Sequence, residues 1–167
     1  MTSKLSSLCS YVTGKVSVDE LTDETYISTE NMLPNKAGIV AATSLPSVAT
    51  TQLYQVGDVL VSNIRPYFKK IWMAQASGGC SNDVLVFRAK ENCDRLFLYY
   101  VLADDNYFEY ATATSKGTKM PRGDKKAILD YSVPSYGIEV QRTIGNILSS
   151  LDNKIAENTR INDNLAA

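Results

Sequence analysis

The chain has 167 residues, 44% of them hydrophobic and 21% charged, a length that suits one globular domain, or one domain with a short appendage. The formal net charge of −1 excludes a uniformly basic protein that coats nucleic acid, although a local basic patch stays open. Histidine is absent, which excludes catalytic centres and metal sites built on imidazole.

The first 136 residues alternate short apolar runs with turn residues, a pattern that predicts several short elements. Leu5 and Leu8 are three residues apart and predict a short helix over residues 4–11. β-Branched and apolar runs predict five strands: Thr25–Ser28, Gly38–Ala41, Val56–Ser62, Lys70–Ala74 and Asp83–Ala89, the last two joined by a loop over Ser77–Gly79.

The apolar period becomes helical after this strand region. Residues 94–103 predict a helix with Asp94 near its N-cap, and residues 106–113 predict a second. Residues 114–123 hold two glycines and one proline, which predicts a loop; Asp124 then begins a short helix, and a strand follows at 131–133. Separated strands and grouped helices favour an α+β fold, a globular domain with a small mixed or antiparallel sheet and flanking helices.

Residues 138–165 contain no proline and predict one long C-terminal helix of about 40 Å. Its apolar stripe consists of Ile144, Ile147, Leu148, Leu151, Ile155 and Ile161, with Asn158 where an apolar residue is expected. A polar residue at such a position is typical of coiled coils, where it fixes register. We therefore expect a globular domain over residues 1–136 and a dimerising coiled-coil arm over 137–167; a helix folded back onto its own domain is the alternative.

Two segments concentrate positive charge. Residues 64–73 carry Arg65, Lys69 and Lys70 without an acid, interleaved with aromatic residues. Residues 115–126 carry five basic residues against Asp124 alone. Basic side chains on glycine-containing loops reach phosphates and groove edges, and arginine reads guanine through two hydrogen bonds. An ordinary solvated surface is the alternative reading of both segments, and the aromatic residues Phe68 and Trp72 are expected in the core.

No catalytic or metal-binding constellation is evident. The three cysteines form no CxxC pair and are typical of reduced thiols in a cytoplasmic protein. Residues 80–83 bring a thiol, a hydroxyl and a carboxylate together, so a hydrolase or nuclease using Cys80 or Asp83 is the weakest hypothesis, because no imidazole would activate them. Neither a dinucleotide-binding nor a P-loop motif occurs, and no stretch predicts a signal peptide or a membrane span.

Residues 128–165 closely resemble the DNA specificity (S) subunits of type I restriction-modification systems. The shared pattern is a strand ending in proline, a Glu-Gln pair opening a helix, then I-x-x-I-L-x-x-L-D-x-K-I and an Asn-rich tail; here Val140 splits the pair. Upstream, three segments resemble the target recognition domain of that family: Tyr26–Met32, Gly57–Pro66 and Gly117–Arg122.

This resemblance implies that residues 1–136 read one half of a bipartite site on double-stranded DNA and that the C-terminal helix is the conserved spacer. In complete subunits two such units pair their helices antiparallel, which sets the gap between half-sites. Methyltransferase (M) subunits that carry S-adenosylmethionine dock onto this scaffold, and a restriction (R) subunit joins for cleavage. The chain itself is then expected to be no enzyme and to hold no cofactor.

The chain departs from the family pattern by having one recognition domain and one helix, so we expect a natural half-subunit or a truncated piece. Either form predicts a two-fold homodimer and an inverted-repeat target. The DNA contacts are predicted in two loops: Arg65, Tyr67, Lys69 and Lys70, and Lys116, Thr118, Lys119 and Arg122. We expect the lysines on phosphates and Arg65 and Arg122 on base edges. A protein-interaction module that recruits partners through the helix, without binding DNA by itself, is the alternative.

Overall fold

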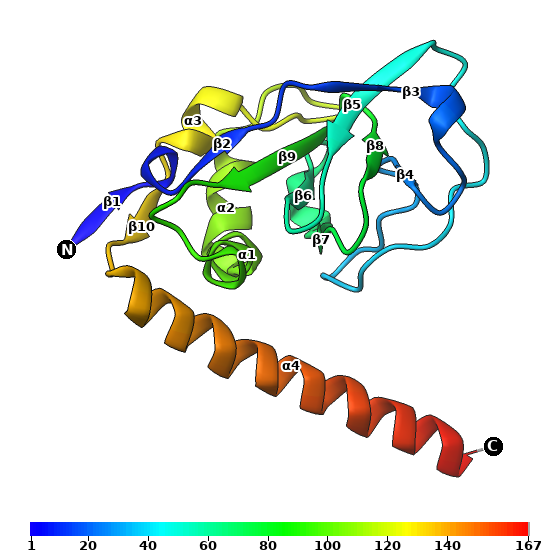
Figure 1. Ribbon diagram of the computed structural model, residues 1–167. Helices are drawn as coiled ribbons and strands as arrows, with labels where there is room; N and C mark the ends of the chain where they lie inside the picture. Colours follow the sequence, from blue (N-terminus) through cyan, green and yellow to red (C-terminus); the bar gives the residue numbers. More distant parts are fainter. Residues whose placement is uncertain (167) are drawn as a thin grey trace.

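The computed structural model describes residues 1–166, so the last residue of the predicted arm, 167, lies outside the described residues. These residues form an α+β fold of short strands and four α-helices (Figure 1), which confirms the expected fold class. The strands are β1 Thr2–Lys4, β2 Cys9–Tyr11, β3 Lys15–Ser17, β4 Tyr26–Ile27, β5 Thr50–Tyr54, β6 Val59–Ser62, β7 Ile71–Met73, β8 Gly78–Cys80, β9 Val84–Ala89 and β10 Ser132–Pro134. The helices are α1 Arg95–Ala103, α2 Asp105–Ala113, α3 Lys125–Leu129 and α4 Ile138–Ala166, with 3-10 turns η1 Leu5–Ser7, η2 Val18–Glu20 and η3 Pro66–Phe68.

The strands form three sheets. One is antiparallel in the order β2-β9-β6-β7, and the second has the order β3-β5-β8-β4 with β4 and β8 parallel. A third, two-stranded sheet pairs β1 with β10, so the N-terminus lies beside the segment that leads into α4. The single small sheet expected from the sequence is therefore divided into three.

Strands β6 and β9 carry the core because both of their faces are buried. Side chains alternate across a strand, so Val61 and Phe87 enter the core shared with α1 and α2, whereas Leu60 and Val86 enter a second core that faces β5 and β8. Burial on both faces explains why these strands read as nearly continuous apolar runs.

Aspartate side chains begin the helices α1, α2 and α3. Asp94 accepts a hydrogen bond from Phe97 N at 3.0 Å, as the sequence predicts. Asp124 accepts from the first backbone N–H groups of α3, which confirms the predicted start of that helix. Asp104 begins α2, so α2 includes Asp105, one residue earlier than expected. Each carboxylate binds backbone N–H groups that have no partner within the helix.

Several local predictions were wrong. Residues 4–11 form η1 and parts of two strands instead of a helix, because residues 9–11 pair with β9. Residues 38–41 form only one isolated bridge, between Met32 and Ile39. Two residues of the loop expected over Ser77–Gly79, Gly78 and Gly79, lie in strand β8, and β3 and β5 were not expected. Gly79 has no room for a side chain, because a Cβ atom there would lie 2.6 Å from Thr51 Cγ2.

Helix α4 confirms the long helix expected over residues 138–165. It spans about 43 Å at 1.5 Å per residue. Figure 1 shows it crossing below the globular part, with its first turns beside α1 and its C-terminal end far from β10. Every residue from 150 to 166 is exposed. Tyr100 of α1 still donates its hydroxyl to Asp152 at 2.8 Å, so contact with the domain extends to that residue.

Candidate nucleic-acid interface

The two basic segments, far apart in the sequence, form one surface. Ile64 and Arg122 pair in an antiparallel bridge, and Arg65 N donates to Pro121 O at 2.8 Å. A guanidinium nitrogen of Arg65 also donates to Lys119 O at 3.4 Å. The structure therefore brings Arg65 together with the loop that holds Lys119 and Arg122. We call residues 64–68 and 115–122 together the basic-loop surface.

The backbone around η3 is held in an uncommon conformation. Arg65 and Lys69 flank this turn with φ angles of 49° and 53°, in the left-handed region that residues with a side chain rarely adopt. Backbone hydrogen bonds from Asn35 N to Phe68 O and from Lys36 N to Lys69 O hold the end of the turn. This loop is therefore a defined structure, not a flexible connection.

Two aromatic rings project from η3. Tyr67 and Phe68 are 48% and 41% exposed, and their ring centroids are 4.9 Å apart. The expectation that Phe68 lies in the core was wrong, because Pro66 is the only residue of this turn that is buried. Trp72 agrees better with that expectation, since it is half-buried and packs edge-on against the buried ring of Tyr54.

Carboxylates engage two of the predicted DNA-binding side chains of the second loop. Arg122 forms a two-pronged ion pair with Asp83, with distances of 3.0 Å and 3.4 Å, and this contact raises the pKa of Arg122. Lys116 pairs with Asp124 at 2.6 Å. Thr118 and Lys119 are exposed near the tip of the loop. Asp83 occupies two donors of Arg122 and leaves the others for a ligand.

Lys69 and Lys70 bind other parts of the protein. Lys69 shares Asp105 with Lys36, at 3.0 Å and 2.8 Å, and these two lysines lower the pKa of that carboxyl. Lys70 donates to Thr29 O at 2.6 Å, and desolvation lowers its pKa. The structure thus does not bring these two ammonium groups to Lys119 and Arg122.

The predicted dimerisation stripe divides into two parts. Ile144 and Leu148 are half-buried between α4 and the domain. The remaining members are exposed: Ile147, Leu151, Ile155, Asn158 and Ile161. The alternative of packing against the domain therefore applies to the first turns of α4, whereas the apolar side chains further along face solvent.

A joint between α1 and α4 fixes the direction of the helix. The side chain of Gln141 is buried, accepts from Asp94 N at 2.9 Å, and donates to Asn92 O and Tyr136 O at 3.1 Å and 2.8 Å. Gly145 is also buried, because a Cβ atom there would lie 2.8 Å from a side-chain carbon of α1. The sequence showed Gln141 only as part of a family motif and did not reveal this contact.

The cysteines are poorly suited to nucleophilic chemistry. Cys9, Cys80 and Cys93 are buried and free, and burial raises the pKa of each thiol to about 12. A thiol with such a pKa is almost entirely protonated at neutral pH. Within residues 1–166, no three His, Cys, Asp or Glu side chains are grouped to hold a metal ion, and no helix is long and apolar enough to cross a membrane.

Residues 1–166 thus form an α+β domain with a basic-loop surface and a projecting helix. The family model described as the type I restriction modification DNA specificity domain matches residues 1–167. The chain belongs to this family of type I restriction-modification specificity domains.

Individual relatives agree with this membership. The chain is 26% identical over 91 residues to the type I restriction enzyme EcoDI specificity subunit of Escherichia coli, covering 54% of this chain and 20% of that subunit. The HsdS subunit from Thermoanaerobacter tengcongensis superposes with a TM-score of 0.70 at 21% identity, covering 96% of this chain and 44% of the other. The S subunit from M. genitalium gives a TM-score of 0.64 at 17% identity, covering 94% and 40%.

A third structure, titled for complex assembly and conformational transition of the type I R-M system, gives a TM-score of 0.73 at 22% identity. The structural matches show that the fold is shared. The chain spans less than half the length of each of these relatives.

Proposed function

We propose that this chain recognises one half of a bipartite DNA sequence as a specificity component of a type I restriction-modification complex. The observation that carries the proposal is the bridge between Ile64 and Arg122, which joins two basic loops of a specificity-family domain into one surface. A protein that reads duplex DNA needs arginines for base edges and further cations for phosphates.

The surface suggests a role for each predicted contact. Arg65 and Arg122 are our candidates for base edges, because backbone and carboxylate contacts orient both guanidinium groups. Lys119 and Thr118 would bind phosphates, Lys116 would add positive charge beside them from its pair with Asp124, and Tyr67 would contact a base or sugar with its exposed ring. Because Lys69 and Lys70 bind protein oxygens, we assign them a supporting part in holding this surface.

We further propose that a second copy of the chain pairs with α4. Residues that alternate every three and four positions form a seam along one side of the helix: Val140, Ile144, Ile147, Leu151, Lys154, Asn158, Ile161 and Leu165. In an antiparallel pair with Lys154 opposite Asn158 of the second copy, Leu151 faces Ile161, and the lysine can donate to the amide oxygen. The exposed apolar side chains of the two seams would thereby cover each other.

Sedimentation equilibrium tests the pairing. We expect a wild-type dimer that the double substitution Leu151→Asp, Ile155→Asp converts to a monomer. The matched control is Asn146→Asp, Asn153→Asp, which adds the same charge on the outer side of α4 and should leave the dimer intact. A wild-type monomer at tens of micromolar would contradict pairing with a second copy.

Cross-linking tests the register. In the proposed register Ile155 lies close to the two-fold axis, so Ile155→Cys should cross-link to itself with a short bis-maleimide, whereas Asn153→Cys should not. The three native thiols are buried and do not compete. Equal cross-linking of both variants would contradict the register.

Selection from random duplexes tests DNA recognition. The chain and a type I methyltransferase subunit, incubated together with a random 30-bp library, should enrich an inverted repeat. Changing Lys116, Lys119 and Arg122 to Ala together should abolish the enrichment, whereas Arg122→Ala alone should relax one position at a cost of about 1–3 kcal/mol. Unchanged binding by the triple variant would mean that the basic-loop surface does not contact DNA.

The exposed seam of α4 also favours the second candidate function, a module that recruits protein partners and binds no DNA. Its signature would be a dimer, or a complex with the methyltransferase subunit, that forms without any enrichment of a DNA sequence. In our proposal S-adenosylmethionine and methyl transfer belong to the M subunits, and cleavage belongs to the R subunit. The chain itself would contribute recognition and assembly without catalysis.

A further inference from the structure

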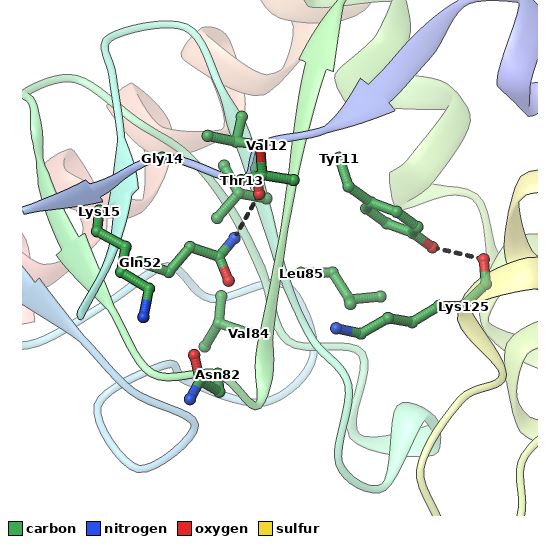
Figure 2. A pocket seen from close by; sticks show the side chains of 11 residues that line it. Tyr11, Val12, Thr13, Gly14, Lys15, Gln52, Asn82, Val84, Leu85 and Lys125 are labelled. Carbon is green, nitrogen blue, oxygen red and sulfur yellow. Dashed lines mark hydrogen bonds between the residues drawn. The ribbon is translucent and has the colours of Figure 1, made fainter. Parts of the chain in front are cut away.

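A basic groove lies beside the basic-loop surface. It encloses about 300 Å³ between the segment that links β2 to β3, the start of β9 and the start of α3. Figure 2 shows that, among its polar side chains, Lys15, Gln52 and Asn82 lie on one side and Lys125 on the other. The residues that line the groove include two lysines and no acid.

The distribution of unpaired lysines singles out this region. Six lysines of the globular part bind an oxygen of the protein: Lys4, Lys36, Lys69, Lys70, Lys90 and Lys116. The other four have no such partner among residues 1–166: Lys15, Lys119, Lys125 and Lys126. Three of these four belong to the segment 115–126, and Lys15 faces that segment across the groove. Positive charge without a counter-charge is therefore concentrated here.

The groove is continuous with the basic-loop surface. Asn82 on one wall precedes Asp83, which holds Arg122. Lys125 on the other wall follows Asp124, which holds Lys116. Each wall is thus one residue away from an ion pair of the basic-loop surface, so a strand of nucleic acid that leaves this surface would meet the groove next.

The walls are held by contacts that leave the ammonium groups available. Tyr11 donates its hydroxyl to Lys125 O at 2.9 Å, and Gln52 donates to Val12 O at 3.3 Å. Figure 2 draws these two hydrogen bonds, and neither uses the ammonium group of Lys15 or Lys125. Two unpaired cations on the fixed walls of a groove suit an anionic ligand.

We propose that this groove binds backbone phosphates of duplex DNA immediately outside the bases that the basic-loop surface reads. This inference rests on the proposed function. The ligand class is the phosphodiester backbone, and the contacts carry no sequence information, because lysine interacts with phosphate as a point charge. The groove thereby extends the DNA footprint of the domain beyond its two predicted loops.

Salt-dependent DNA binding tests the groove directly. The full chain and the methyltransferase subunit are titrated with the selected duplex over a range of salt concentrations. Loss of one phosphate contact lowers the slope of log K against log salt by about 0.9, so Lys15→Ala, Lys125→Ala should lower it by about 1.8. The order of preference among sequences should not change.

Two sets of variants make this result specific. Lys4→Ala, Lys90→Ala removes the same charge elsewhere and should keep the wild-type slope. A duplex with neutral methylphosphonates just outside the recognised bases should bind wild type more weakly and the Lys15, Lys125 variant with no further loss. Each variant should unfold at the same midpoint temperature as wild type, which would show that its fold is retained.

Other outcomes would overturn the inference in distinguishable ways. If Lys15→Ala, Lys125→Ala keeps the wild-type slope while Arg122→Ala weakens binding, the groove proposal fails and the proposed function stands. If wild type shows no salt-dependent DNA binding at all, both fail. If millimolar inorganic phosphate shifts the NMR signals of Asn82 and Lys125 but the duplex does not, the groove is a site for small anions and not for DNA.

Discussion

Replacing Gln141 is the most direct test of the joint between the recognition domain and its helix. This side chain is 1% exposed and binds Asp94 N, Asn92 O and Tyr136 O. Its amide thus links the loop before α1, the segment before α4 and α4 itself. Gln141→Ala removes the three hydrogen bonds and leaves three backbone groups without this partner in the domain.

The expected loss of stability in Gln141→Ala follows from those hydrogen bonds. A hydrogen bond contributes about 1 kcal/mol net, and a buried group left without a partner costs more, so Gln141→Ala should lower the free energy of unfolding by about 2–4 kcal/mol. Urea unfolding, followed by circular dichroism, measures this change. Amide exchange at Asp94 should accelerate at the same time, because its N–H loses its acceptor.

Two further variants separate this explanation from a general loss of helix. Arg142→Ala removes only an exposed pair with Glu139 and should cost at most about 0.5 kcal/mol. Gln141→Glu keeps the acceptor but loses the donor, and burial raises the pKa of the new carboxyl. Its stability relative to wild type should therefore improve as the pH falls, when protonation restores a donor. A loss below about 1 kcal/mol for Gln141→Ala would refute the reasoning.

Two other predictions concern the same helix and the second basic loop. Gly145→Ala should destabilise the protein, although alanine favours helix by about 1 kcal/mol, because the new Cβ would lie 2.8 Å from Leu96 Cβ. Asn146→Ala, on the exposed side of the helix, should not destabilise it, and equal thermal midpoints for the two variants would contradict this packing. The carboxyl of Asp124 should titrate near pH 2 in a carbon-13 NMR experiment, because Lys116 and two backbone amides stabilise its charged form. Its stabilising effect is then present above about pH 4 and is lost as the pH falls through 2, and Lys116→Ala should raise the midpoint.

Local signals in the sequence were sufficient for helices α1 to α4, although they also predicted a helix over residues 4–11 that does not form. Asp94 and Asp124 precede helical runs and accept from the N–H groups that such runs leave free. The helical spacing of apolar residues along α4 can be recognised without knowledge of any distant contact. The same is true of β6 and β9, whose apolar content reflects burial on both faces.

The elements that depend on distant partners were not predictable in this way. Residues 9–11 are a strand because β9 lies beside them, and β5 is a strand despite a polar sequence because β3 and β8 pair with it. Gly78 and Gly79 indicate a loop by composition. They nevertheless occupy a strand, where neighbouring segments of the protein approach too closely to leave room for a side chain. In each case tertiary packing overrode local preference.

The candidate site shows the same division. The sequence reveals that charge is concentrated in two segments, but not that Ile64 pairs with Arg122. Nor does it reveal which cations are already engaged, since Arg122 and its carboxylate partner Asp83 are 39 residues apart. Nothing in the sequence around Lys15 indicates a role in binding, because its position opposite Lys125 depends on how two sheets and α3 pack together.

Strands β6 and β9 are buried on both faces, and this has a consequence for how the domain can change. Their first face supports α1, to which the arm is joined, and their second face packs against the sheet of β5 and β8. The basic loops leave from strand and helix ends and take no part in the joint at Gln141. Substitutions in these loops should therefore leave the direction of the arm unchanged. Under the proposed function, DNA specificity would then change while assembly through α4 stays the same.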